Sequence, residues 1–296
     1  MYKLAIIIPI HNGLMYTKRC LANLYQNIKS PKNIDIIIID DGSKDESAKW
    51  IIRNYPNVKI LYGDGNLWWS GAVNLGVKFA LEELKTDYIV LWNNDIECEE
   101  DYFRNLFMVL KDANPKLIIG SLVMYKNKEK YILSFGGSIN LKTAKKKLNF
   151  SGEILDSIEL IEMEVDWLPG MGTIINKNII NDIGYWDSIN CPQVYGDIDF
   201  TLRAKKRGYQ IISSPKLKIF NDTVQTSILH QNSFKLLIKS LFYKNSNYNI
   251  YWDFRFHRKH FKIGFIIFTL LEKYIRYIGG FFKHKTINFF KYRFSK

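Results

Sequence analysis

The sequence contains little cysteine and no segment typical of secretion or membrane insertion. Its three cysteines are Cys20, Cys98 and Cys191. They are odd in number, far apart and without metal-ligand spacing, which argues against a disulfide framework and a zinc site. The apolar run Leu4–Ile8 follows one lysine and ends at Pro9, too short for a secretory signal. The longest apolar run, residues 263–271, has nine residues, whereas about 20 are needed to span a bilayer. We therefore expect a cytoplasmic protein that does not cross a membrane.

A glycine fingerprint for a dinucleotide is also incomplete. Gly63 and Gly65 resemble its beginning, but Leu67 and Trp68 follow where a third glycine is required, and the pair does not follow the first strand. The turn at residues 11–15 lacks the glycine-rich basic loop that usually holds a triphosphate in nucleotidyltransferases. The sequence therefore disfavours both kinds of site.

Positive charge is concentrated in the last part of the chain. The formal net charge is +13, and residues 231–296 contain fourteen Lys or Arg and two acids, which gives this tail +12. A near-neutral body with a basic, aromatic tail indicates one specialised surface. Three interpretations stay open: helices that pack with a solvated basic face, a surface that binds an anionic membrane, and contacts with nucleic acid.

Short β-branched runs alternate with helix-like segments over the first 120 residues. The expected strands are 4–8, 34–39, 58–61, 88–91 and 117–119, and the expected helices are 15–27, 45–54, 71–84 and 99–112. Residues 36–39 are isoleucine at every position, which fits a strand buried on both faces of a parallel sheet. The pattern predicts an α/β domain with a largely parallel sheet. We expect residues 121–165 to be hairpin or loop material inserted in the same domain.

Polar residues follow four of these strands. The segments are Pro9–Asn12, Asp40–Ser43, Gly63–Asn66 and Asn93–Asp95. Each alone is typical of a turn or a helix cap. Because ligands of open α/β sheets bind outside the carboxyl ends of the strands, the four together predict a polar ligand site.

These motifs together resemble a known family. The stretches are IIIPIHN, IIIIDDGS, GDGNLWWSGAVNLG, LWNNDIE and GDIDF. Their order and spacing, over about residues 3–225, resemble the family 2 inverting glycosyltransferases, in particular the bacterial rhamnosyltransferase-like members that build surface polysaccharides such as O-antigen or capsule. The resemblance implies the GT-A fold, a Rossmann-like, mostly parallel central sheet flanked by helices, here with a basic C-terminal helical extension.

The resemblance also implies roles for individual residues. Pro9, His11 and Asp41 match the positions that hold the nucleotide base. The other substrate-binding positions are Asn66, Trp69, Asn74, Gly76, Asn94, Trp167, Gly172 and Asp199. Asp95 matches a ligand of Mg²⁺ or Mn²⁺ on the diphosphate, and Asp197 matches the catalytic base. Core packing is the alternative for Trp69 and Trp167, and a tight turn is the alternative for residues 167–173.

Elementary chemistry supports these positions. A departing nucleoside diphosphate accumulates negative charge, and a divalent cation can take most of its ligands from phosphate and water, so one carboxylate can suffice. Inversion needs a second carboxylate on another segment to take the proton of the acceptor hydroxyl. Asp199 competes with Asp197: on a strand both would share a face, whereas at a helix start they diverge and one becomes an N-cap.

Two departures from the family pattern concern the metal. The usual Asp-x-Asp is Asn93-Asn94-Asp95, and residues 216–227 hold no histidine that could serve as a further ligand. Asn221 and Asp222 lie in that segment, and His230 is the nearest histidine.

We therefore expect an enzyme that transfers a sugar from a nucleotide diphosphate sugar to a saccharide acceptor carried on a polyprenyl diphosphate lipid. Residues 1–227 would form the catalytic domain, with 1–120 as the nucleotide-sugar half and 121–227 as the acceptor half. Residues 228–296 would place the protein peripherally on the inner face of the plasma membrane, with no nucleic acid bound. The alternatives are a nucleotidyltransferase-like α/β enzyme and a nucleic-acid-binding protein that uses the tail.

Overall fold

The computed structural model describes residues 2–29, 31–222 and 233–294. Within them the chain divides into two compact units. The first unit comprises residues 2–138 and 147–222, and the second comprises residues 139–146 and 233–294. The predicted boundary at residues 227/228 and the histidine at position 230 lie outside the described residues.

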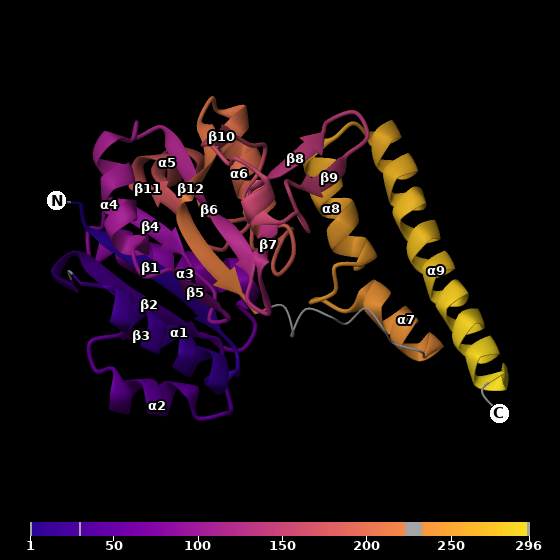
Figure 1. Ribbon diagram of the computed structural model, residues 1–296, viewed down its shortest axis with the longest axis horizontal. Coiled ribbons are helices and arrows are strands. Elements are labelled where there is room, and N and C mark those ends of the chain that lie inside the picture. Colours follow the sequence, from indigo (N-terminus) through magenta and orange to yellow (C-terminus); the bar gives the residue numbers. More distant parts are fainter. Residues whose placement is uncertain (1, 30, 223–232, 295–296) are drawn as a thin grey trace. The chain divides into compact units, whose positions relative to one another are not determined.

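The first unit begins with alternating strands and helices (Figure 1). They are β1 (Leu4–Ile10), α1 (Leu14–Asn27), β2 (Ile34–Asp40), α2 (Ser47–Asn54), β3 (Lys59–Tyr62), α3 (Trp68–Glu82) and β4 (Tyr88–Leu91), with a short 3-10 helix at Pro31–Asn33. Strand β1 pairs in parallel with β2 and β4, and β2 pairs in parallel with β3. Ile36 to Ile39 are buried at every position, as a strand covered on both faces requires. The predicted parallel α/β half is confirmed.

The rest of the sheet is mixed. The strands and helices of this part of the first unit are β5 (Ile96–Cys98), α4 (Tyr102–Asp112), β6 (Leu117–Tyr125), β7 (Lys128–Ser134), β10 (Met163–Glu164), β11 (Thr173–Asn176), α5 (Lys177–Ile183), α6 (Gly196–Lys206) and β12 (Gln210–Asn221). The strand order is β10-β12-β6-β11-β4-β1-β2-β3, with β5 on β12 and β7 on β6. Strand β11 lies antiparallel between β4 and β6, and β12 pairs in parallel with β6. The sheet is therefore parallel from β4 to β3 and mixed beyond β4.

Strand β6 is longer than the sequence pattern predicts. The apolar run ends at Ile119, but the strand continues through Gly120 and Ser121 to Tyr125. A Cβ atom at Gly120 would lie 2.1 Å from Leu168 Cδ2, so a larger residue there would displace the buried Leu168 side chain. Strands β6 and β7 form the predicted hairpin material. Strands β8 (Gly137–Asn140) and β9 (Lys145–Leu148) form a separate two-stranded sheet, and a 3-10 helix spans Leu155–Ser157.

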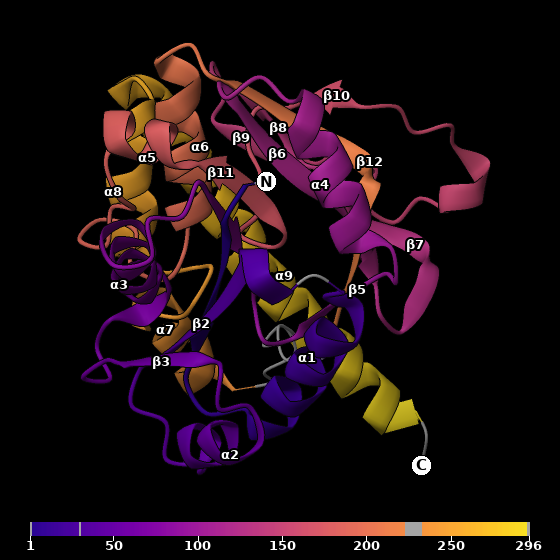
Figure 2. The same cartoon turned by 90° about the vertical axis from the view of Figure 1, so that its left-hand side faces the viewer.

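Helices cover both faces of the large sheet (Figure 2). On one face, Ile6, Ile8 and Ile38 pack in a cluster with residues of α1 and α4 such as Leu24 and Leu106. The opposite face of the same strands joins a second cluster with residues of α3, α5 and α6. This two-sided core fixes the carboxyl ends of the parallel strands, where the predicted site residues lie.

The second unit contains α7 (Phe234–Phe242), α8 (Ile250–His260) and α9 (Ile263–Phe294). Asp253 is fully buried, and its carboxylate accepts hydrogen bonds from Lys273 Nζ at 2.6 Å and from the Tyr274 hydroxyl. His257 is buried one turn later, with Nδ1 2.6 Å from the Asp253 carbonyl oxygen. Burial lowers the pKa of His257 to about 4. Among the described residues, no helix combines the length and apolarity that crossing a membrane requires.

Candidate active site

Four strand ends meet at one edge of the parallel half of the sheet. Ile10 pairs with Asp40 and Ile7 pairs with Leu91, so β1, β2 and β4 finish near one another. Asp40 also pairs with Tyr62, which brings the end of β3 to the same edge. The polar segments that follow these strands therefore share one edge, as the sequence predicts.

Asp41 anchors the loop after β3. Its Oδ1 accepts the backbone N–H of Gly65 at 2.8 Å, and its Oδ2 accepts the N–H of Trp68 at 3.0 Å. A Cβ atom at Gly63 would lie 2.4 Å from Asp41 Oδ1, so the close approach of this loop depends on glycine. His11 Nδ1 lies 2.6 Å from the Asp41 carbonyl oxygen. The structure thus joins His11 and Asp41, with Pro9 half-buried at the end of β1.

The neighbouring Asp40 has a different function. Its Oδ1 accepts the backbone N–H of Ser43 at 2.8 Å, which closes the turn after β2. The turn interpretation of this motif therefore holds for Asp40, whereas Asp41 faces the adjoining loop.

Three other residues predicted to contact the donor have distinct surroundings. Asn66 is exposed, and its N–H donates to Asp64 Oδ1 at 2.9 Å. Asn74 makes two hydrogen bonds with the backbone of Trp186, at 2.8 and 2.9 Å. Gly76 lies against the sheet, where a Cβ atom would be 2.6 Å from Ile39 Cδ1. Asn74 and Gly76 thus hold α3 in place, and only Asn66 offers an exposed side chain to a ligand.

The Asn-Asn-Asp motif after β4 contains one carboxylate, and one of its two oxygens has no hydrogen-bond donor among the described residues. Trp69 Nε1 donates to Asn93 Oδ1 at 3.3 Å, and Asn94 Nδ2 donates to Thr17 Oγ1 at 3.0 Å. Asp95 Oδ1 is buried and accepts no hydrogen bond from any described residue. Burial, and then the charge of Asp222, raise the pKa of Asp95 to about 6.

Asp222 lies beside Asp95 because β5 pairs with β12. Ile96 is opposite Asn221 in this pairing, and the N–H of Asp222 donates to the Asp95 carbonyl oxygen at 3.0 Å. Arg19 Nη2 contacts Asp222 Oδ2 at 3.1 Å. No group of three or more His, Cys, Asp or Glu side chains suited to a metal occurs in the part of the chain described. A buried carboxylate oxygen without a donor, next to a second carboxylate, fits a cation that takes its other ligands from phosphate and water.

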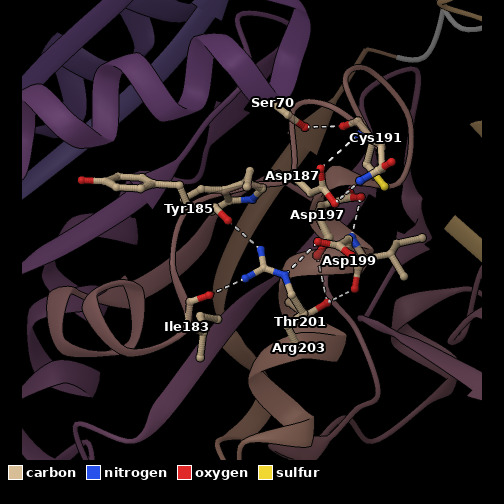
Figure 3. A network of polar contacts seen from close by, with 12 residues as sticks. Ser70, Ile183, Tyr185, Asp187, Cys191, Asp197, Asp199, Thr201 and Arg203 are labelled. Atoms are coloured by element: carbon tan, nitrogen blue, oxygen red, sulfur yellow. Dashed lines mark hydrogen bonds and ion pairs between the residues drawn. The ribbon is translucent and has the colours of Figure 1, made fainter. Parts of the chain in front are cut away.

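Asp197 and Asp199 lie in the first turn of α6, and their surroundings differ (Figure 3). Asp199 is fully buried and pairs with Arg203 Nε at 2.9 Å. Arg203 also donates to the carbonyl oxygens of Ile183 and Tyr185, each at 2.7 Å. Asp199 is therefore part of an internal scaffold that joins α6 to the segment after α5.

Asp197 is half-buried instead, and its Oδ2 accepts the backbone N–H of Gly170 at 3.0 Å. The predicted helix start is confirmed, and the two aspartates diverge. The expectation that one of them becomes the N-cap is wrong, because Tyr195 occupies that position in a left-handed conformation with φ of 69°.

A comparison with known families covers the part of the chain that forms this sheet edge. The family described as glycosyl transferase family 2 matches residues 5–155, just over half of the 296 residues, including Asp41 and Asp95. The chain belongs to glycosyl transferase family 2. The prediction that it is a glycosyltransferase is thereby confirmed, whereas Asp197 lies outside the matched residues.

Two relatives of this family 2 glycosyltransferase have names that describe sugar transfer. The low-salt glycan biosynthesis hexosyltransferase Agl10 of Haloferax volcanii is 22% identical over 244 residues, which are 79% of this chain and 69% of that protein. The dolichyl N-acetyl-alpha-D-glucosaminyl phosphate 3-beta-D-2,3-diacetamido-2,3-dideoxy-beta-D-glucuronosyltransferase of Methanococcus voltae is 24% identical over 291 residues, which are 90% of this chain and 82% of that protein.

A solved structure has a fold similar to that of this glycosyltransferase. The crystal structure of GalNAc-T7 with UDP, GalNAc and Mn²⁺ superposes with a TM-score of 0.60 at 13% sequence identity. The alignment covers 93% of this chain and 57% of that chain. At this identity the likeness concerns the fold, and it confirms the predicted GT-A class.

Two residues predicted on the acceptor side of this glycosyltransferase lie in the loop before β11. Trp167 is 7% exposed, its Nε1 donates to the Ser138 carbonyl oxygen at 3.4 Å, and its indole lies against Gly137. These contacts correspond to the core-packing alternative. Gly172 adopts φ of 62°, and its N–H donates to the Leu91 carbonyl oxygen at 2.9 Å. Gly172 therefore fastens the loop to the end of β4.

Two contacts of the family 2 site escaped the sequence argument. The pairing of Asp222 with the Asn-Asn-Asp motif depends on β5, a three-residue strand too short to produce a periodic signal. The bond from Gly170 to Asp197 joins segments 27 positions apart. The only available signals were the acidic residue after the last strand and the glycines of the Pro169–Gly172 turn.

Proposed function

We propose that the chain is an inverting glycosyltransferase that transfers a sugar from a nucleotide diphosphate sugar to a saccharide acceptor in bacterial surface-polysaccharide synthesis. The observation that carries the proposal is the set of three carboxylates with different surroundings. Asp41 is engaged with a loop, Asp95 has an oxygen without a donor, and Asp197 is half-buried at a helix start. Donor binding, metal binding and proton transfer need those three environments.

In this proposal Asp41 and His11 hold the nucleotide base at the ends of β1 and β2. Asp41 keeps the loop of residues 63–68 in place through two backbone N–H groups. Each carboxylate oxygen has a second lone pair, so Asp41 can still accept a hydrogen bond from an N–H group of the nucleotide base. Asp95, with Asp222 beside it, would hold Mg²⁺ or Mn²⁺. The ion would supply positive charge for the departing diphosphate.

Asp197 is proposed to take the proton of the acceptor hydroxyl. The hydroxyl oxygen forms a bond to the anomeric carbon from the face opposite the diphosphate. The bond from that carbon to the diphosphate oxygen breaks, and the configuration inverts. The Gly170 N–H binds one carboxylate oxygen of Asp197 and the Ile198 N–H binds the other, and these two bonds orient the carboxylate. Asp199 is a supporting residue, because its charge is paired with Arg203.

The proposal is tested by product stereochemistry and by binding. We expect one nucleoside diphosphate to raise the melting temperature of the full chain, with a larger rise when Mn²⁺ or Mg²⁺ is present. The resemblance to rhamnosyltransferase-like members makes a rhamnosyl donor the first one to assay. The anomeric configuration of the product, measured by NMR, should be opposite to that of the donor. A retained configuration would refute the inverting mechanism, and incorporation of nucleotide into the product would favour nucleotidyl transfer.

We also propose that the acceptor is carried on a polyprenyl diphosphate lipid and that the second unit binds the inner face of the plasma membrane. More than half of the exposed large apolar side chains among the described residues lie in 233–283. On α9, Ile263, Ile267, Leu271 and Ile275 recur every fourth residue and are 56–68% exposed. An apolar stripe on a basic helix is the arrangement that binds anionic lipid surfaces.

Vesicle flotation of the full chain tests the membrane proposal. Leu271→Asp should reduce binding to vesicles that contain anionic lipid. Ile161→Asp, at an exposed apolar residue of the first unit, should not. If the wild type instead forms a concentration-dependent dimer and does not bind vesicles, and if Leu271→Asp prevents that dimer, the apolar stripe would be a contact with a second copy of the chain. Salt-sensitive nucleic-acid binding without lipid binding would favour the nucleic-acid alternative.

A further inference from the structure

Trp69 connects the two halves of the candidate site. It lies in the first turn of α3, and its Nε1 donates to Asn93 of the Asn-Asn-Asp motif. Its backbone N–H donates to Gln193 Oε1 at 3.0 Å, in the segment that leads into α6. The adjacent Ser70 donates to the carbonyl oxygen of Cys191 at 2.6 Å (Figure 3). The start of α3 is therefore fixed both to the end of β4 and to the start of α6.

The indole of Trp69 also lies against two glycines on either side of Asp197. A Cβ atom at Gly170 would be 2.2 Å from Cζ2 of the indole. A Cβ atom at Gly196 would be 3.1 Å from Cζ3. Gly170 donates the hydrogen bond to Asp197, and Gly196 precedes Asp197 in the chain. The ring thus contacts both backbone segments that determine where the carboxylate lies.

We propose that Trp69 is a positioning residue that sets the distance between the Asn-Asn-Asp motif and the carboxylate of Asp197. This inference rests on the proposed function, and it replaces the prediction that Trp69 binds the substrate directly. The indole has one edge on Asn93 and another on the backbone around Asp197. A large, rigid ring transmits a fixed separation, whereas a flexible side chain does not.

The separation matters because the acceptor hydroxyl must lie between Asp197 and the anomeric carbon. Reacting atoms need to be about 3–3.5 Å apart, and a misplacement of about 1 Å can cost about 100-fold in rate. Trp69 therefore affects the rate of the chemical step more than the affinity for the donor. Donor binding depends on the strand ends, which the sheet core fixes independently.

Two glycine substitutions give a matched test. Neither Gly170 nor Gly71 has a positive φ, so alanine is compatible with the backbone at both positions. At Gly170 the new methyl group would occupy the position of the indole. At Gly71, which lies two residues after Trp69 in α3, the new methyl group would lie 3.4 Å from Leu67 Cβ, an ordinary van der Waals contact. Gly71→Ala is therefore the control for Gly170→Ala.

We expect Gly170→Ala to lower kcat by about 10- to 100-fold with the donor KM changed less than about threefold. Trp69→Phe, whose ring is too short to reach either contact fully, should lower kcat about tenfold. The double variant should be no worse than Trp69→Phe alone, because the smaller ring makes room for the methyl group. If the fold-loss in kcat of the double variant equals the product of the two single losses, the proposal is overturned. A raised donor KM with unchanged kcat in Trp69→Phe would instead support direct binding of the donor by Trp69.

A second measurement does not depend on activity. The Gly170 amide is protected from hydrogen exchange by its bond to Asp197, so Trp69→Phe should accelerate its exchange at least about tenfold while the amides of β4 stay unchanged. Unchanged exchange at Gly170 would refute the positioning role, even if Gly170→Ala fails to fold. A wild-type chain that transfers no sugar would refute the proposed function, whereas the exchange result would still test the contact.

Discussion

Asparagine substitutions at Asp199 and Asp197 should have opposite effects on stability and activity. Asp199→Asn removes the negative charge that pairs with Arg203, although the shape of the side chain is kept. The Arg203 side chain is 19% exposed and the Asp199 side chain 0%, so solvent screens this pair weakly. Loss of one partner of a buried pair costs about 3–5 kcal/mol. Arg203 keeps two carbonyl acceptors, which places the expected cost near the lower end, about 3 kcal/mol.

That cost converts into a measurable melting temperature. A domain of this size loses about 2–4 °C per kcal/mol, so Asp199→Asn should melt about 6–12 °C below the wild type. Asp197→Asn should melt within about 4 °C of the wild type, because the amide oxygen can accept one of the Gly170 and Ile198 N–H groups and the loss of the other bond costs about 1 kcal/mol. Its transfer rate should fall by at least about 100-fold, since the proton acceptor is lost.

Differential scanning fluorimetry and a transfer assay with each purified variant provide the two readouts. Nucleotide binding by Asp197→Asn serves as the control for an intact donor site. The assignment would be refuted if Asp199→Asn melted like the wild type and lost activity while Asp197→Asn stayed active. In that outcome Asp199 would be the catalytic base, and its ion pair with Arg203 would be present only while no substrate is bound.

Three further predictions concern other carboxylates and one histidine. Asp41→Ala should weaken nucleoside diphosphate binding at least about tenfold in calorimetry, because two N–H groups of the loop of residues 63–68 lose their acceptor. Asp95→Asn should abolish the Mn²⁺-dependent part of nucleotide binding. In the wild type that part should fall as the pH drops below about 6, since protonated Asp95 cannot bind a cation. The pKa of His257, lowered to about 4 from 6.5, means that the unfolded state binds the proton more readily. The second unit should therefore lose up to about 3 kcal/mol as the pH falls from 6.5 to 4. Hydrogen exchange of α8 in the full chain should show this loss, and His257→Gln should remove it; an equal loss in that variant would contradict the assignment.

Local sequence patterns predict the parallel half of the fold well. Residues 36–39 are isoleucine throughout because β2 is covered on both faces, and that requirement is local. The acids and amides after β1, β2 and β4 follow for the same reason, since parallel strands end at one edge. The sequence alone was therefore sufficient to bring His11, Asp41 and Asp95 to one region of the molecule.

The other half depends on pairings that no local pattern contains. Strand β11 inserts between β4 and β6 although about fifty residues separate it from β6 along the chain. Asp222 reaches Asp95 through the short strand β5. Gly76 has the sequence context of a ligand loop, yet it permits α3 to approach Ile39 closely. Each of these outcomes depends on packing between segments distant in sequence, which periodicity and composition do not encode.

The antiparallel direction of β11 has a consequence for how such a chain can diversify. Thr173, the first residue of β11, pairs with Leu91, the last residue of β4. The chain therefore enters the sheet at the same edge where its parallel neighbours leave it. Between β6 and β11 the chain returns to the large sheet at β7 and at β10, so residues 135–162 lie outside the strands of that sheet. This stretch can be lengthened, shortened or exchanged while the strand ends that carry Asp41 and Asp95 keep their geometry. Under the proposed function, exchanging this stretch between homologues is expected to change the acceptor preference while Asp41 and Asp95 are left unchanged.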